Sequence, residues 1–210
     1  QFLQAYHVIC SKKCDAIYGL FVINGKKDSK KIIVSNYAKH LSGFNGIFWS
    51  SSQYIYDLKY LKRNEIYFEN SKDFGEDLLF NIKFFVTMPK VIYTNFYLFN
   101  YQTALSSTIT QMEKNNKLFL YFGENLLNSI YLLNKFDNKE PSIYFSNYFI
   151  DYYLKLYVNK KRSERTEIKR LLKKMNYLTL IKNTTHKKQF LLLRLGIDLY
   201  SIVVKILIYR

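Results

Sequence analysis

The chain has 210 residues, of which 49% are hydrophobic, and contains only 7 Gly, 2 Pro and 2 Cys. This composition excludes a collagen-like chain, a disordered tract and a small disulfide scaffold, and it is sufficient for a buried core. The 32 Lys and Arg outnumber the 16 Asp and Glu, and the net charge of +16 predicts an anionic partner such as phosphate, nucleic acid or lipid.

The first part of the chain alternates between strand and helix patterns. Residues 15–23 form an almost unbroken apolar run, which predicts a buried strand. Asn24-Gly25 follows and predicts a hairpin turn, with a returning strand over residues 30–34. A short helix is predicted over residues 53–63 from the spacing of its apolar side chains.

The clearest element is a helix whose apolar face runs from Leu78 to Val86. Asp73 and Glu76 resemble a capping box at its start, and Pro89 ends it. Two strands are predicted after it, over residues 90–94 and 96–101.

After residue 111 the pattern becomes helical. Helices are predicted over residues 118–133, 142–158, 163–175 and 190–209. The sequence therefore predicts an α/β part over residues 1–110 and an all-helical, basic part over residues 111–210.

The basic charge is concentrated in the last quarter of the chain. Residues 160–210 hold 14 Lys and Arg against 3 Asp and Glu, a net charge of +11. In the last predicted helix one narrow stripe carries the polar side chains, namely Lys187, Arg194, Asp198, Ser201 and Lys205. A wide apolar face with a thin charged stripe predicts a helix that lies on an anionic membrane surface. The alternative is that the apolar face packs on the rest of the protein.

The sequence predicts no metal site of its own. Cys10 and Cys14 form a single CxxxC pair, and the histidines, His7, His40 and His186, are scattered. A zinc site needs about four converging ligands, so two reduced thiols are the simpler interpretation.

Four features in order carry a family resemblance. Glu76-Asp77 lies in the run GEDLLFN at residues 75–81, and the block FWSSSQYIYDLKYLKRNEIYF precedes it at residues 48–68. Val91-Ile92-Tyr93 with Leu98-Phe99-Asn100-Tyr101 follows, and then a polar loop at residues 106–110. This set resembles the bacterial family 2 glycosyltransferases over residues 15–110. The resemblance implies a partial GT-A-like, Rossmann-like α/β domain followed by an all-helical C-terminal extension.

The resemblance also implies an inverting sugar transfer from a nucleotide sugar to an acceptor hydroxyl. Asp77 would be the general base that takes the hydroxyl proton, and Glu76 would orient the acceptor or hold Asp77. Trp49, Gly75 and Tyr101 would contribute to substrate binding, with Trp49 as an apolar platform for a sugar ring. The local pattern alone also fits a capped helix and a core tryptophan.

In this family a nucleotide-binding half precedes the region, and its Asp-x-Asp motif holds the diphosphate through a divalent metal, Mg or Mn. No two Asp residues here are separated by one residue; they are Asp15, Asp28, Asp57, Asp73, Asp77, Asp137, Asp151 and Asp198. We therefore expect the acceptor-side portion of a longer enzyme, inactive alone, whose metal binds elsewhere. The strand at residues 16–23 would then lack sheet partners and expose its edges.

The expected partners are a nucleotide-sugar donor and a glycan or lipid-linked acceptor of a bacterial surface polysaccharide or lipooligosaccharide. The third expected partner is the cytoplasmic membrane, and we expect the C-terminal helices to attach the protein peripherally to its inner face. Two alternatives are a non-catalytic, membrane-associated helical protein and a single-stranded nucleic-acid binder. No nucleic-acid-binding signature is present, so no nucleic-acid partner is expected.

Overall fold

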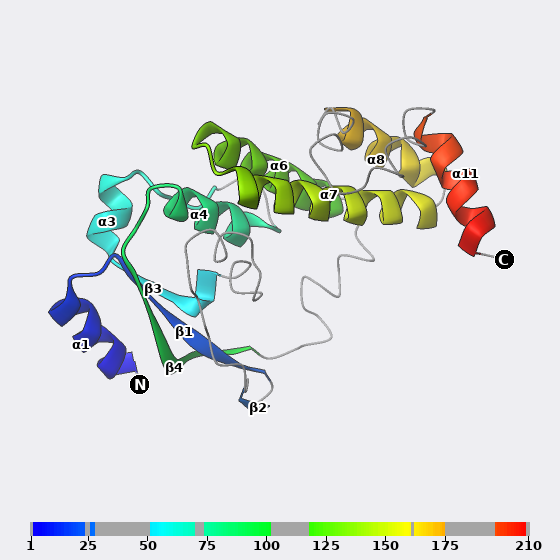
Figure 1. Cartoon of the computed structure of the whole chain (residues 1–210). Coiled ribbons are helices and arrows are strands. Elements are labelled where there is room, and N and C mark those ends of the chain that lie inside the picture. The colour runs from blue at the N-terminus through cyan, green and yellow to red at the C-terminus, as the bar shows by residue number, and fades with distance from the viewer. Residues whose placement is uncertain are drawn as a thin grey trace. The chain divides into compact units, whose positions relative to one another are not determined.

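A computed structural model describes residues 2–23, 26–27, 51–69, 74–101, 118–160, 162–174 and 196–208. The chain divides into two compact units, residues 1–138 and residues 139–210. The first unit combines a four-stranded sheet with helices, and the described part of the second is helical (Figure 1). The fold is therefore mixed α/β, as the sequence predicts.

The sheet is built around the strand β1 (Ala16–Ile23), which confirms the predicted strand. The long strand β4 (Val91–Tyr101) runs parallel to β1 along its whole length, from the pair Ala16 and Val91 to the pair Ile23 and Tyr101 (Figure 1). On the other edge, β3 (Tyr54–Tyr56) pairs antiparallel with the start of β1, and β2 (Lys26–Lys27) pairs with its end. β1 is thus the central strand, which explains its unbroken apolar sequence.

The expectation that β1 would expose its edges is wrong, because β4 covers one edge while β3 and β2 share the other. Among the described strands, β2, β3 and β4 each pair only with β1, so none of the three has a described partner on its outer edge. β2 pairs antiparallel with the end of β1, Lys26 opposite Ile23. Asn24-Gly25, where the hairpin turn is predicted, and the predicted returning strand over residues 30–34 lie outside the described residues.

The two strands predicted between residues 90 and 101 are one strand with an irregularity. The register passes from Tyr18 opposite Tyr93 to Leu20 opposite Tyr97, so β4 accommodates extra residues beside Gly19. A Cβ atom at Gly19 would lie 2.4 Å from Leu98 Cγ and 2.6 Å from the Phe96 carbonyl oxygen. Gly19 therefore allows the bulged strand to approach closely.

The helix predicted over residues 53–63 is wrong in its first half. A short 3-10 turn, η2 (Ser51–Gln53), leads into β3, and the helix α3 (Leu58–Arg63) begins only after Asp57. The Asp57 side chain accepts a hydrogen bond from the Lys59 amide at 2.9 Å, so it caps α3. Pairing with β1 therefore outweighs the local helical spacing at Tyr54–Tyr56.

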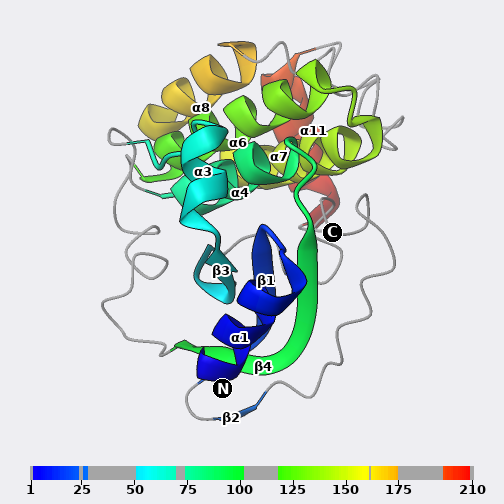
Figure 2. The ribbon, with the colours of Figure 1, turned by 90° about the vertical axis from the view of Figure 1, so that its left-hand side faces the viewer.

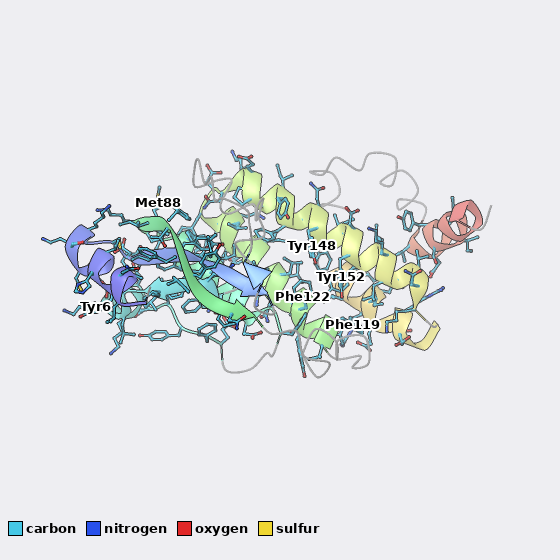
Figure 3. All side chains as sticks on the ribbon, turned by 90° about the horizontal axis from the view of Figure 1, so that it is seen from below. Tyr6, Met88, Phe119, Phe122, Tyr148 and Tyr152 are labelled. Carbon is cyan, nitrogen blue, oxygen red and sulfur yellow. The ribbon has the colours of Figure 1, made fainter. Side chains whose placement is uncertain are left out.

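Three longer helices complete the first unit. The helix α1 (Phe2–Lys12), which the sequence analysis did not predict, precedes β1, and Tyr6 on it is exposed (Figure 3). The predicted helices at 78–86 and 118–133 are confirmed as α4 (Glu76–Phe85) and α6 (Leu118–Lys135). α4 and α6 pack against each other, as Figure 2 shows.

The second unit contains α7 (Lys139–Asn159), α8 (Arg162–Lys174) and α11 (Ile197–Ile208). The predictions for 142–158 and 163–175 are confirmed, and of the helix predicted over 190–209 the structure describes residues 196–208. Both α8 and α11 pack on α7. Among the described helices, none is long and apolar enough to cross a bilayer.

Candidate active site

The two adjacent acids predicted as catalytic, Glu76 and Asp77, form the start of α4. Gly75 precedes them in a left-handed conformation, with φ 83° and ψ 2°, and Phe74 also has a positive φ of 82°. A bulky side chain rarely adopts such a φ, and strain of this kind persists only where the surroundings hold it. The backbone just before the acids is therefore held under strain.

Residues of α6 hold the strained backbone at Phe74 and Gly75 in place. The buried Asn125 donates a hydrogen bond from Nδ2 to the Phe74 carbonyl oxygen at 2.8 Å. The Phe74 ring meets Phe122 edge to face, with 5.4 Å between ring centroids. A Cβ atom on Gly75 would lie 2.9 Å from Phe122 Cδ2, so glycine is needed both for its φ and for the approach of α6. Contact of Gly75 with substrate stays a prediction.

The predicted capping box of Asp73 and Glu76 is wrong. Gly75 is the N-cap, it makes no side-chain capping hydrogen bond, and Glu76 is the first helical residue rather than the third. Asp73 lies outside the described residues. Both acids stand in the first turn of α4, near the positive end of the helix dipole.

A serine outside α4 orients one of the two acids. Ser51, in η2, donates a hydrogen bond from Oγ to Asp77 Oδ1. Among the described residues, Asp77 Oδ2 has no hydrogen-bond partner. This arrangement fixes the direction of the carboxylate.

The second acid is in a different environment. Glu76 Oε2 is buried, and no described residue hydrogen-bonds to it. A buried polar oxygen without a partner costs free energy, so such atoms in folded proteins call for an explanation. A ligand hydroxyl that donates to Glu76 would remove this cost.

A tyrosine lies beside Asp77 on the sheet side. The Tyr56 hydroxyl donates to Asn81 Oδ1 at 2.6 Å, and Asn81 is fully buried one turn after Asp77. Burial, and in second place the negative charge of Asp77, hold the pKa of Tyr56 well above its ordinary value. Tyr56 therefore stays protonated at neutral pH and remains a hydrogen-bond donor.

Aromatic rings support α4 on this side. The Phe80 ring meets Tyr56 edge to face, with centroids 5.2 Å apart, and stacks on Phe68 at 4.1 Å with an interplanar angle of 5°. Phe84 meets Tyr56 and Tyr60 at similar distances. These contacts fix α4 relative to β3, and with it the position of the acids.

The structure thus brings together Gly75, Glu76 and Asp77 of the predicted site. Trp49 lies outside the described residues. Tyr101 ends β4, where its backbone pairs with Ile23, and its side chain is outside the described part. The roles predicted for Trp49 and Tyr101 therefore stay predictions.

The motifs of the sequence do not point to the supporting residues Ser51, Tyr56, Asn81 and Asn125. Two of them carry a local signal. Tyr54 and Tyr56 alternate with period two, which is typical of a strand, and Asn81 is a polar residue on an apolar helix face. Ser51 and Asn125 carry none, because their partners lie 26 and 51 positions away in the sequence.

The resemblance implies a divalent metal in the complete enzyme, but the described residues do not fit one. Nowhere in the described ranges do three or more His, Cys, Asp or Glu side chains gather as metal ligands would. Cys10 is exposed and Cys14 is buried, and neither forms a disulfide.

The chain has a glycosyltransferase-like fold. It is similar to the crystal structure of residues 1–349 of S. aureus TarS, a glycosyltransferase, in complex with UDP-GlcNAc. The TM-score is 0.70 and the sequence identity is 15%. The match covers 95% of this chain and 61% of the TarS chain, so the chain spans about three fifths of the length of that structure. No protein-family model and no curated protein sequence matches.

Proposed function

We propose that this chain is the acceptor-side portion of an inverting glycosyltransferase with a GT-A fold, similar to the family 2 enzymes. The observation that carries the proposal is the pair of acids at the start of α4, one of them oriented by Ser51, in a chain with a glycosyltransferase-like fold. General-base catalysis needs an ionised carboxylate within hydrogen-bond reach of the acceptor hydroxyl. Ser51 orients Asp77 for this role, and no described residue hydrogen-bonds to its second carboxylate oxygen.

In the proposed reaction the acceptor hydroxyl oxygen forms a bond to the anomeric carbon of a nucleotide sugar. The bond from that carbon to the diphosphate oxygen breaks, and its electron pair leaves with the nucleotide. The hydroxyl proton moves to Asp77 Oδ2, the oxygen opposite the one that Ser51 holds. Attack from the face opposite the leaving group inverts the anomeric configuration.

Glu76 has a separate role in this proposal. Its buried Oε2, which no described residue pairs, accepts a hydrogen bond from an acceptor hydroxyl and so orients the sugar. Gly75 lets the backbone approach the substrate, while Trp49 and Tyr101 provide aromatic faces for it.

The donor that we propose is a nucleotide sugar, because TarS was crystallised with UDP-GlcNAc. The acceptor that we propose is a hydroxyl of a bacterial surface glycan, free or lipid-linked. We further propose that the divalent metal of this reaction binds in the complete enzyme outside the described residues.

The test is nucleotide release from UDP-GlcNAc in the presence of a cell-envelope extract. It uses the protein as the source cell makes it, beside the 210-residue chain, which we expect to be inactive alone. Asp77→Asn should lower kcat by about 10²–10⁴, the range for loss of a general base. The control is Asp57→Asn, the same change at the start of α3, where Asn caps a helix as well as Asp does.

An Asp77→Asn variant with the full rate would overturn the assignment of the base. Absence of nucleotide release from the complete protein with any nucleotide sugar would overturn the proposed function itself.

A further inference from the structure

The second unit presents two aliphatic side chains to solvent on its last helix. Leu199 is 42% exposed and Ile202 is 55% exposed, and they lie three residues apart on α11. The opposite side of the helix is buried through Ile197, Tyr200 and Ser201. The exposed aliphatic pair is therefore the outer face of a helix that is packed on its inner face.

One residue of the predicted polar stripe of the last helix lies elsewhere: Ser201 is buried, at 2% exposed, whereas Asp198 is exposed as predicted. Leu199 and Ile202, which the sequence places on the wide apolar face, are exposed. The reason is the polar anchoring of the first turn of α11. Asp198 accepts hydrogen bonds from Tyr157 of α7 and from Lys169 Nζ of α8, the latter at 2.6 Å, and these contacts set the rotation of the helix.

The Asp198–Lys169 contact also places the aliphatic pair next to a basic helix. Leu199 directly follows Asp198, and Ile202 lies one turn further on. On α8, Lys169 is followed by the exposed Arg170 and, one turn later, by the exposed Lys173. Residues 160–174 carry eight Lys and Arg against two Glu, a net charge of +6.

Two of the cations beside the aliphatic pair are ion-paired, Arg170 with Glu167 at 2.8 Å and Lys169 with Asp198 at 2.6 Å. Glu164 pairs with Lys160 at 3.2 Å, so the positive charge of this surface comes from the surplus of Lys and Arg in residues 160–174. The Arg165 guanidinium donates hydrogen bonds to the Lys160 and Val158 carbonyl oxygens at the end of α7. Lys173 has no ion pair among the described residues.

We propose that the basic–apolar surface, formed by Lys169, Arg170, Lys173, Leu199 and Ile202, binds an anionic lipid bilayer. The cations lie at the level of the lipid phosphates, and the two aliphatic side chains enter the boundary between headgroups and acyl chains. This proposal stands on the second unit alone and does not depend on sugar transfer.

Two features favour lipid over nucleic acid as the partner. A single strand is bound through aromatic side chains on which its bases stack, whereas the exposed apolar side chains described on α11, Leu199 and Ile202, are aliphatic. Aliphatic side chains beside cations match a partner that offers phosphate and hydrocarbon at neighbouring depths, which a bilayer does.

The experiment is sedimentation of the 210-residue chain with phosphatidylcholine vesicles, with and without phosphatidylglycerol, at low and high salt. We expect binding to the anionic vesicles that weakens with salt. Exchanging Leu199 and Ile202 together for Ser should lower the partition coefficient about tenfold, and Arg170→Gln with Lys173→Gln should lower it by a similar factor.

The matched control is Ile143→Ser, an exposed aliphatic residue on α7, which should bind as the unchanged chain does. Thermal unfolding of each variant verifies that it is folded. Two results would overturn the proposal: no binding to anionic vesicles, or unchanged binding when Leu199 and Ile202 are both replaced. A single-stranded oligonucleotide that binds more tightly than the vesicles, with no effect of the Leu199 and Ile202 changes, would assign the surface to nucleic acid instead.

Discussion

Asn125 on α6 donates a hydrogen bond to the backbone carbonyl of Phe74, 51 positions earlier, at 2.8 Å. Phe74 lies two residues before Glu76, so α6 holds the backbone that leads directly into the two acids. The contact joins a helix of the predicted helical region to the site predicted in the α/β region. The geometry of the acids therefore depends on both parts of the sequence.

We expect Asn125→Ala to lower the free energy of unfolding by about 1–3 kcal/mol, because it leaves the partly buried carbonyl oxygen of Phe74 without its donor. Urea denaturation measures this. Asn128→Ala, on the exposed side of the same helix, should change the free energy of unfolding by less than about 0.5 kcal/mol. Equal effects of the two substitutions would mean that the Asn125 hydrogen bond does not hold the loop.

Two glycines with positive φ allow the effect of backbone strain on stability to be distinguished from the effect of steric contact. Gly75 has φ 83° with Phe122 Cδ2 2.9 Å from the position of a Cβ, whereas Gly196 has φ 120° and no described atom within 4 Å of that position. Gly196→Ala should cost about 1–3 kcal/mol through the backbone alone, and Gly75→Ala should cost more. Thermal unfolding ranks the two, and a smaller loss at Gly75 would contradict the close approach of α6.

The Ser51 hydrogen bond should matter for rate more than for folding. Ser51→Ala in the complete enzyme should lower kcat about ten- to a hundredfold, because a hydrogen bond to a charged group contributes about 1.5–3 kcal/mol. Ser51→Thr keeps the hydroxyl and should restore most of the rate. A loss of rate that is the same for Ala and Thr would show that bulk, and not the hydroxyl, matters at this position.

Buried tyrosines should make stability fall in alkali. Burial raises the pKa of Tyr54 and of Tyr56, and the charge of Asp77 raises that of Tyr56 further. In the unfolded chain both phenols titrate near pH 10, so above that pH the unfolded state loses protons that the folded state keeps. Each contributes stability that is complete below about pH 10 and is lost as pH rises, with a slope of at most about 1.4 kcal/mol per pH unit.

Urea denaturation between about pH 8 and pH 11 measures this slope. Tyr56→Phe should unfold more easily at pH 8, since the bond to Asn81 is lost, but its stability should fall less steeply above pH 10. The remaining tyrosines are the same in both proteins, so the difference in slope belongs to Tyr56. Parallel curves would mean that Tyr56 titrates alike in the folded and unfolded states.

The sequence alone predicts the elements whose signal is local. The apolar run of β1 and the periodic apolar faces of α4, α6, α7 and α8 are where the patterns place them. The Glu76-Asp77 pair is likewise found at the start of a helix. Local periodicity is reliable here because the buried face of each element is set by its own side chains.

The sequence-based predictions are wrong where contacts between residues distant in the sequence determine the secondary structure or the burial of a residue. Tyr54–Tyr56 is a strand because an edge of β1 is available to it, and Ser201 is buried because Asp198 sets the rotation of α11. Neither outcome is visible within a window of a few residues. The same holds for Ser51, whose hydrogen bond to Asp77 exists only once η2 and α4 have packed.

The close packing of α6 on the start of α4 determines where the protein can be divided. A recombinant fragment that ended between β4 and α6 would contain both acids but would lack Asn125 and Phe122, which hold Phe74 in its strained conformation. Gly75 would then face solvent, and the first turn of α4 would be free to fray. The shortest fragment, or the smallest module for a chimeric enzyme, that preserves the paired carboxylates therefore extends through the end of the first unit at Asn138.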